Sequence, residues 1–226
     1  MDNLIELIID GQLERVKMLA SNGVNVNTKY DFGRTALYVA VIQQYLEAVK
    51  FLIENKADIN VRDEFGVTPL MAGCAKDNIA IIRFLIEHGA KINTIDNDGR
   101  TPLINASYAN KSSIVRILID HGANLNHKGE FGWSALTLAV QKGYTETVTI
   151  LIDSGADIDS RDHDGMTPLI HASINGDLSM LKLLVNRGAD VNIRDYNEMT
   201  AFSHTFHSHK NSEIMAFLIK NGTEFF

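Results

Sequence analysis

The chain has 226 residues, of which 45% are hydrophobic and 22% are charged, so it can bury a substantial core as one large domain or two small ones. Its formal net charge of -7 argues against nucleic acid or an anionic membrane as the default partner, because both require a basic surface. The single cysteine, Cys74, excludes an internal disulfide.

At the N-terminus, residues 1–29 contain two helical patterns without a preceding turn, so we expect an N-terminal capping repeat whose first helix covers residues 3–9. Asp2 and Glu6 stand where a secretory signal would carry lysine or arginine, and no small-residue cleavage site follows. No apolar run approaches the roughly 18 residues needed to cross a bilayer. We therefore expect a soluble, cytoplasmic protein.

From here on, two short patterns recur every 33 residues, as from Gly33 to Gly66. The first has the form Gly-x-Thr-Pro-Leu and occurs at 33–37, 66–70, 99–103, 132–136 and 165–169, with a decayed copy at 198–202. The second has the form Gly-Ala-Asp-x-Asn and occurs at 23–27, 56–60, 89–93, 122–126, 155–159 and 188–192, and its last copy is 222–226. Both patterns stay in register along the chain, so they define one repeated structural unit.

Each unit is expected to contain two short helices. In the repeat 162–194, Thr167 is a good N-cap and Pro168 suits the first helical position, so a helix is expected from about Thr167 to Asn175. Gly176 supplies the left-handed residue that ends it. A second helix follows, with an apolar face of Leu178, Leu181, Leu184 and Val185, and the segment rich in Asn, Asp and Gly after Gly188 is expected to be a hairpin.

Helices of roughly nine residues do not persist alone in water, so each unit must bury its apolar side against the next. This unit, with its Asp-x-x-Gly-x-Thr-Pro-Leu and Leu-Leu-x-x-Gly-Ala-Asp-x-Asn signatures, resembles the ankyrin repeat over essentially all of residues 1–226. The resemblance implies an all-α solenoid of stacked helix–turn–helix units joined by β-hairpin-like loops. We expect one continuous domain with a C-terminal capping repeat at 195–226 and full repeats at 30–62, 63–95, 96–128, 129–161 and 162–194.

The sequence departs from the family's pattern at two kinds of position. The usual His after Thr-Pro-Leu is replaced, so the hydrogen-bond link that it makes in the family is expected to be absent; the replacements are Tyr38, Met71, Ile104, Thr137, Ile170 and Ser203. Gln44 and Lys56 stand where glycine ends a helix, which predicts that the repeat 30–62 is locally the least stable. Asp77 and Asn110 share the position of Gln44, but Asp and Asn tolerate the left-handed backbone conformation better than Gln does.

The sequence contains no motif for a phosphate loop, a zinc protease or a nucleophile elbow, and we expect neither an enzyme nor a cofactor. Three histidines, His204, His207 and His209, gather near the C-terminus, with His171 one repeat before His204. They suit either a metal or solvated imidazoles, and the second interpretation is favoured because no carboxylate or thiol is placed beside them. Cys74 falls in a helical position and is expected to be a buried, unreactive thiol.

The resemblance implies that the hairpins and the first helices form a concave groove. Aromatic, Met and Ile side chains there are candidate partner-binding anchors, namely Phe65, Tyr108, Phe131, Trp133, Met166, Ile174, Tyr196 and Met199. The alternative, about equally weighted for the phenylalanines, is that Phe32, Phe65 and Phe131 pack on neighbouring hairpins. Trp133 fits that alternative less well.

Basic residues recur at one further position and would form a stripe that steers an acidic partner; they are Lys29, Arg62, Lys128, Arg161 and Arg194, interrupted by Ile95. Pairing with the adjacent acids Asp63, Asp162 and Asp195 is the favoured alternative. We expect a monomeric, non-enzymatic module that binds, sequesters or tethers an unidentified protein. The alternatives are a metal-binding or enzymatic role of the histidines, and a stabilising subunit of a larger assembly.

Overall fold

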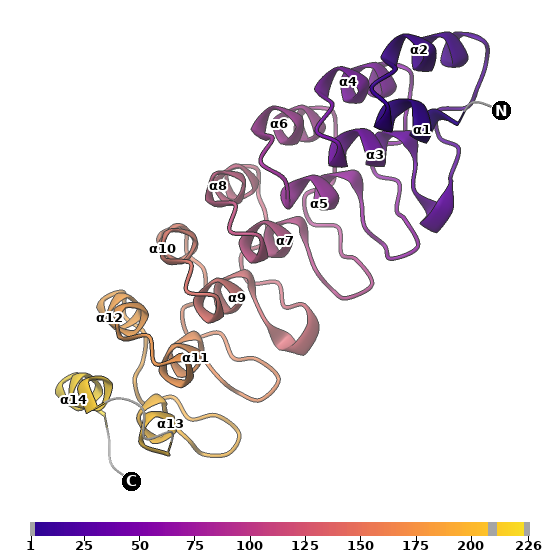
Figure 1. The fold of residues 1–226 in the computed structure, drawn as a ribbon. Coiled ribbons are helices and arrows are strands. Elements are labelled where there is room, and N and C mark those ends of the chain that lie inside the picture. The colour runs from indigo at the N-terminus through magenta and orange to yellow at the C-terminus, as the bar shows by residue number, and fades with distance from the viewer. Residues whose placement is uncertain (1–2, 208–211, 224–226) are drawn as a thin grey trace. The chain divides into compact units, whose positions relative to one another are not determined.

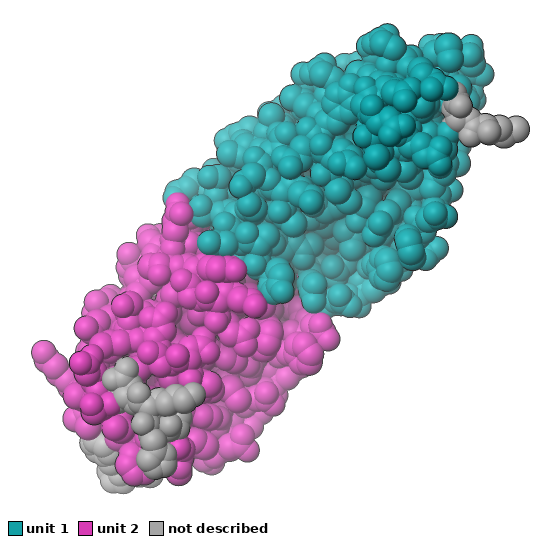
Figure 2. All heavy atoms as spheres, in the orientation of Figure 1, with its two compact units in different colours: residues 1–123 teal, residues 124–226 magenta. Residues whose placement is uncertain are grey.

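The structure is a computed structural model that describes residues 3–207 and 212–223. Every regular element in these two ranges is an α-helix or a short 3-10 turn, and none is a strand, which confirms the all-α class. The chain divides into two compact units, 1–123 (unit 1) and 124–226 (unit 2), coloured separately in Figure 2. Each unit is described by itself.

Unit 1 consists of helix pairs stacked in chain order (Figure 1). Its first helices α1, α3, α5 and α7 pack one on the next, and its second helices α4, α6 and α8 form a parallel layer. The bounds are α1 Leu4–Ile9, α2 Leu13–Ser21, α3 Ala36–Ile42, α4 Leu46–Glu54, α5 Pro69–Cys74, α6 Ile79–Glu87, α7 Pro102–Tyr108 and α8 Ser112–Asp120, with the 3-10 turn η1 Asp31–Gly33.

Unit 2 repeats this arrangement. First helices α9, α11 and α13 pack in sequence, and second helix α12 contacts α14. The bounds are α9 Ala135–Gln141, α10 Thr145–Asp153, α11 Pro168–Asn175, α12 Leu178–Asn186, α13 Ala201–His207 and α14 Ser212–Lys220, with the 3-10 turn η2 Glu130–Gly132.

The helix signals found in the sequence act as expected. Thr167 caps α11 by accepting a hydrogen bond from the Ile170 amide, Pro168 is the first helical residue, and Gly176 ends the helix with φ of 71°. The apolar side of each first helix is buried: the equivalent side chains of α3, α5 and α7 (Leu37, Leu70 and Leu103) are at most 1% exposed. Burial against the neighbouring helices therefore stabilises helices that are too short to persist alone.

Three of the four non-glycine positions expected to be left-handed have that conformation. Gln44 and Lys56 have φ of 58° and 64°, a conformation that costs a non-glycine residue about 1 kcal/mol. Asn110 follows them with φ of 54°, but Asp77 is not among the described residues of positive φ. In that repeat α5 ends at Cys74, and the Asn78 side chain caps α6 through the Ile81 amide, so the chain takes another path between the helices.

A ladder of asparagines joins each repeat to the next. The Asn27 side chain donates to the Lys56 carbonyl and accepts from the Asp58 amide, at 3.0 and 2.6 Å. Asn60 makes the same pair of bonds with Gly89 and Lys91, at 3.1 and 2.8 Å. An amide is suited to this position because it has a donor and an acceptor on one side chain.

Asp159 occupies the ladder position in unit 2 but has only acceptors. Its carboxylate accepts from the Asp190 amide at 3.2 Å, and it has no N–H to donate to the carbonyl of Gly188. Burial raises the pKa of Asp159; the hydrogen bond from Asp190 opposes that rise, and the charges of Asp190 and Asp157 add to it. Asp159 is therefore a suboptimal residue in an otherwise regular ladder.

Replacing Asp159 by asparagine is expected to raise the free energy of unfolding by about 1 kcal/mol at neutral pH, because it restores the missing donor and removes a repelled charge. A raised pKa means that wild-type stability is lost as the pH rises through the carboxyl's titration, so the gain should shrink toward pH 4. Urea denaturation at both pH values measures it. The control is Asp157→Asn, which removes an equal charge while keeping the acceptor that Asp157 offers to the Asp159 amide; an equal gain there would contradict the explanation.

Candidate functional site

The hairpins that precede the first helices form one linked surface in unit 2, here called the unit-2 hairpin face (residues 129–133, 162–166 and 195–199). Each hairpin closes through its own backbone, as in the bond of 3.0 Å from the Asp162 amide to the Met166 carbonyl. Adjacent hairpins are joined by bonds of 3.0 Å from the His163 amide to the Phe131 carbonyl and from the Tyr196 amide to the Asp164 carbonyl. Backbone groups therefore join the hairpins of this face, which leaves its exposed side chains free to vary.

Unit 1 has an equivalent surface, the unit-1 hairpin face (residues 30–34, 63–67 and 96–100). The Glu64 amide donates to the Phe32 carbonyl and the Asn97 amide to the Phe65 carbonyl, both at 2.9 Å. The rings of Phe32 and Phe65 stack with centroids 6.2 Å apart, so these two phenylalanines do pack on neighbouring hairpins. Each nevertheless remains more than half exposed, at 54% and 53%. Packing of the two phenylalanine rings on each other thus leaves them accessible to a partner.

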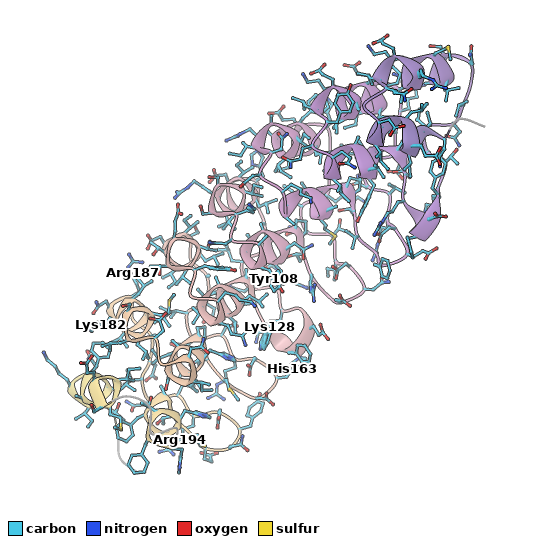
Figure 3. The ribbon with its side chains drawn as sticks, viewed as in Figure 1. Tyr108, Lys128, His163, Lys182, Arg187 and Arg194 are labelled. Carbon is cyan, nitrogen blue, oxygen red and sulfur yellow. The ribbon has the colours of Figure 1, made fainter. Side chains whose placement is uncertain are left out.

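The structure places the candidate anchors on both units. In unit 1, Phe65 lies exposed on a hairpin. Tyr108, labelled in Figure 3, lies exposed at the end of α7. The other six lie in unit 2, of which Phe131, Ile174 and Tyr196 are exposed, whereas Trp133, Met166 and Met199 are half-buried. The candidates therefore divide into two sets, and within unit 2 they gather on the unit-2 hairpin face and the end of α11.

Trp133 has a structural role in addition to its place on this face. Its indole Nε1 donates to Oδ2 of Asp162 at 3.3 Å, and its ring lies 5.4 Å from the Phe131 ring. Its ring also meets the His171 ring edge-on at 6.1 Å. A variant of Trp133 is therefore expected to change the hairpin's support as well as its surface.

Two buried carboxylates hold the hairpins of unit 2 onto their helices. Asp162 is 5% exposed, and its Oδ2 lies 2.8 Å from Nε2 of His171 on α11. One repeat later, Oδ2 of Asp195 lies 2.7 Å from Nε2 of His204 on α13. Sequence reasoning missed both contacts, although the signal was present: in these two repeats a histidine follows the hairpin aspartate by nine residues.

These contacts add a link that was not expected and correct one expectation. His171 and His204, one position after the place of the family's histidine, join hairpin to helix in unit 2. His204 is also not a solvated imidazole, because its side chain is 17% exposed and pairs with Asp195. Burial raises the pKa of Asp195, but hydrogen bonds from His204 and from the Met199 and Asn197 amides outweigh it and bring the pKa below its usual value.

The remaining candidates for metal binding or catalysis were His209 and Cys74. His209 lies outside the described residues. Within the described ranges, no group of three His, Cys, Asp or Glu side chains is arranged to hold a metal ion. Cys74 is fully buried in α5, and this burial raises the pKa of its thiol far above the usual range, so the thiol stays protonated.

The basic residues bind backbone carbonyls of the following repeat. In unit 1, Lys29 donates to the Arg62 carbonyl at 3.1 Å and Arg62 donates to the Ile95 carbonyl at 2.8 Å. In unit 2, Lys128 (Figure 3) donates to the Arg161 carbonyl at 2.7 Å and Arg161 donates to the Arg194 carbonyl at 3.0 Å. The last of the series, Arg194, donates to the Glu198 carbonyl at 3.1 Å. Their cationic atoms thus help to join successive repeats.

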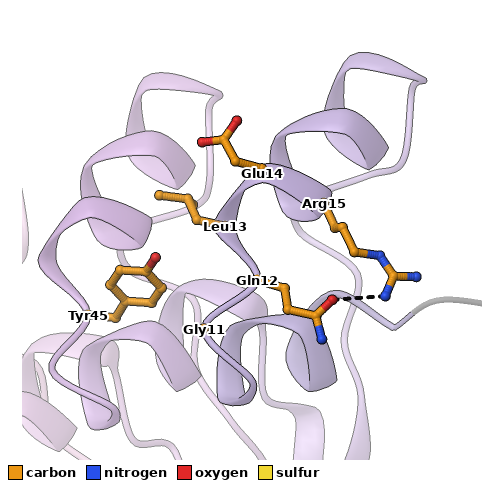
Figure 4. A pocket seen from close by; sticks show the side chains of 6 residues that line it. All are labelled: Gly11, Gln12, Leu13, Glu14, Arg15 and Tyr45. Atoms are coloured by element: carbon orange, nitrogen blue, oxygen red, sulfur yellow. Dashed lines mark hydrogen bonds between the residues drawn. The ribbon is translucent and has the colours of Figure 1, made fainter.

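A shallow hollow of unit 1 lies apart from the hairpins (Figure 4). It is lined by Tyr45 and residues 11–15, at the turn between α1 and α2. The Arg15 guanidinium donates to the Gln12 side chain at 2.8 Å across its edge. None of the candidate anchors lines this hollow.

Stacked helix pairs with linked hairpins define a helical-repeat protein, and the comparisons with known proteins give the family. The family described as "Ankyrin repeats (3 copies)" matches residues 4–96, 90–162 and 154–225. The chain therefore belongs to the ankyrin-repeat family, and its fold is the ankyrin-repeat solenoid. Ankyrin repeats are in general non-enzymatic modules for protein–protein interaction.

A solved structure, the human ASB11 ankyrin repeat domain, resembles this chain with a TM-score of 0.85 and 25% identity over 100% of both chains. No curated protein matches the sequence. None of the described helices is both long enough and apolar enough to cross a membrane.

Proposed function

We propose that this chain is a non-enzymatic module that binds one protein partner, which it sequesters or tethers, through its hairpins and first helices. The observation that carries the proposal is the exposure of aromatic side chains on hairpins whose backbones are bonded to one another. Phe65, Phe131 and Tyr196 are between 53% and 66% exposed on these linked hairpins. Aromatic side chains held on a rigid support are the usual anchors of protein interfaces, since little side-chain entropy is lost on binding.

The proposed surface extends from the hairpins onto the first helices. Tyr108 on α7 is 54% exposed and Ile174 on α11 is 38% exposed, each at the end of its helix. A standard interface buries about 800 Å² of each partner, which a set of hairpins and helix ends can supply. The basic residues are not included, because their cationic atoms bind backbone carbonyls. We also propose that the protein is a cytoplasmic monomer, consistent with its buried, unpaired Cys74.

A pull-down from cell extract with wild type and a Tyr108→Ala, Trp133→Ala double variant tests the proposal. We expect the variant to lose its partner, with at least a tenfold drop in recovery, because two anchors are removed. Since Trp133 also supports Asp162, a second double variant, Phe65→Ala with Tyr196→Ala, removes two rings that are more than half exposed. Circular dichroism confirms that each variant is folded.

The matched control is Met18→Ala with Ile79→Ala, which removes exposed apolar side chains from second helices α2 and α6, where they are 52% and 40% exposed. This control should recover the partner as wild type does. If both anchor variants keep every partner while folded, the hairpin surface is not the binding surface. Metal analysis of the purified protein and size-exclusion chromatography of cell extract test the metal-binding and assembly-subunit alternatives.

A further inference from the structure

A hairpin phenylalanine of unit 1 already holds a cation. The guanidinium carbon of Arg34 lies 5.3 Å from the centroid of the Phe32 ring and 5.2 Å from that of the Tyr38 ring. Nε of Arg34 also lies 3.9 Å from Oδ2 of the buried Asp63. The combination of an exposed aromatic face and a nearby carboxylate is a favourable site for a guanidinium or ammonium group.

The same backbone conformation recurs in unit 2 without the arginine. Phe131 lies in a 3-10 turn with φ of 59°, as Phe32 does with φ of 60°, and a glycine follows each. Three repeats separate them, so Trp133 occupies the position equivalent to that of Arg34. Among the described residues, the ring that approaches Phe131 is that of Trp133, and Phe131 is 56% exposed. Thr137 stands where Tyr38 stands in unit 1, so the unit-2 site keeps one of the two rings and gains Trp133 in place of the chain's own cation.

The charges of the unit-2 hairpin face favour an incoming cation. Its three hairpins contain five acidic residues and no lysine or arginine. Asp162 and Asp195 are buried and bind histidines, whereas the other three acids, one on each hairpin, are exposed: Glu130, Asp164 and Glu198. The neighbouring basic residues direct their cationic atoms to backbone carbonyls of the following repeat. The exposed part of the face therefore combines aromatic rings with negative charge.

We propose that Phe131 and Trp133, with Glu130 and Asp164 beside them, bind an arginine or lysine side chain from a basic segment of the partner protein. The cation binds the exposed part of the Phe131 ring, beside the Trp133 indole that stands where Arg34 stands in unit 1. This inference rests on the proposed function and adds to it the chemical class of the partner's contact segment. Exposed acids draw the segment to the face, and the aromatic pair selects its cationic group.

Trp133 is the only tryptophan of the chain, so its fluorescence reports binding at this site directly. The probe is a capped Gly-Ser peptide with three arginines, compared with the same peptide carrying citrulline, a neutral isostere, or glutamate. We expect the arginine peptide to change the emission and to bind at least about threefold more tightly than the citrulline peptide, and Phe131→Ala to weaken it by about fivefold. Asp164→Asn should weaken binding and reduce its dependence on salt.

The matched control is Phe32→Ala, which removes the equivalent ring of unit 1 and should leave the arginine peptide's affinity at the unit-2 site unchanged. Equal binding of the citrulline peptide, tighter binding of the glutamate peptide, or an unaltered Phe131→Ala variant would each overturn the inference. One outcome is that the double variant Phe65→Ala, Tyr196→Ala loses the partner while neither Phe131→Ala nor excess arginine peptide reduces its recovery. In that case the proposed function stands and this inference fails. If the arginine peptide binds as expected but no variant loses a partner, the cation site stands and the proposed function fails.

Discussion

Replacing Asp162 by alanine is expected to lower the free energy of unfolding by about 3 kcal/mol, because one buried carboxylate satisfies four donors. Its Oδ1 accepts from the amides of Asp164 and Met166, both at 2.9 Å, which fixes the hairpin. Its Oδ2 accepts from Nε1 of Trp133 and lies 2.8 Å from Nε2 of His171, which fixes the hairpin to α11. Alanine removes the buried carboxylate and leaves these donors without their acceptor. Urea denaturation followed by the helical circular dichroism signal measures the loss.

Asp164→Ala is the matched control for this prediction. Asp164 belongs to the same hairpin but its side chain is exposed, so its removal should change the free energy of unfolding by no more than about 0.5 kcal/mol. Asp162→Asn is a second test, since the amide keeps an acceptor for the backbone donors and should cost less than alanine. Similar losses for Asp162→Ala and Asp164→Ala would show that the four hydrogen bonds contribute nothing measurable.

Gly132→Ala is expected to be the second large effect, at about 2 kcal/mol or more. Gly132 has φ of 76°, and a Cβ there would lie 2.8 Å from the amide nitrogen of His163 and 3.1 Å from the carbonyl carbon of Asp162. The left-handed conformation alone costs a non-glycine residue about 1 kcal/mol. The rest of the loss arises because the next hairpin must move, which strains the bond from the His163 amide to the Phe131 carbonyl.

A glycine of the same unit separates these two contributions. Gly155 has φ of 93°, and a Cβ added there meets nothing within 4 Å. Gly155→Ala should therefore cost only the conformational part, about 1 kcal/mol. Thermal unfolding of both variants, each measured against wild type, gives the comparison. If the two substitutions cost the same, the close approach of successive hairpins has no energetic consequence.

The repeated architecture was predictable because its signals are local. Capping threonines, prolines at the first helical position and glycines at helix ends act within a few residues, so the sequence alone placed α11 within one residue at its start. Even the strain at Gln44 and Lys56 followed from their positions in the repeat. Asp77 was the exception, since α5 ends at Cys74 and Asp77 does not have a positive φ.

The contacts of the site were less predictable, for two physical reasons. The pairing of Asp162 with His171 joins a hairpin to a helix, and only the fold determines that these side chains point toward each other. The basic residues bind carbonyl oxygens, and every residue type has one, so the acceptors leave no trace in the sequence. The pairing expected between Arg161 and Asp162 gave way to a bond with the Arg194 carbonyl, while Asp162 binds His171 and Trp133.

The position of the chain's only thiol has an experimental consequence. Because Cys74 lies fully enclosed in α5, a thiol reagent reaches it only after that helix separates from its neighbours. The rate of thiol labelling in native buffer therefore measures the local opening of unit 1. Trp133 emission follows unit 2 in the same sample. The wild-type chain thus has one probe of opening in each unit, and comparing the two signals shows whether the units open together or one at a time.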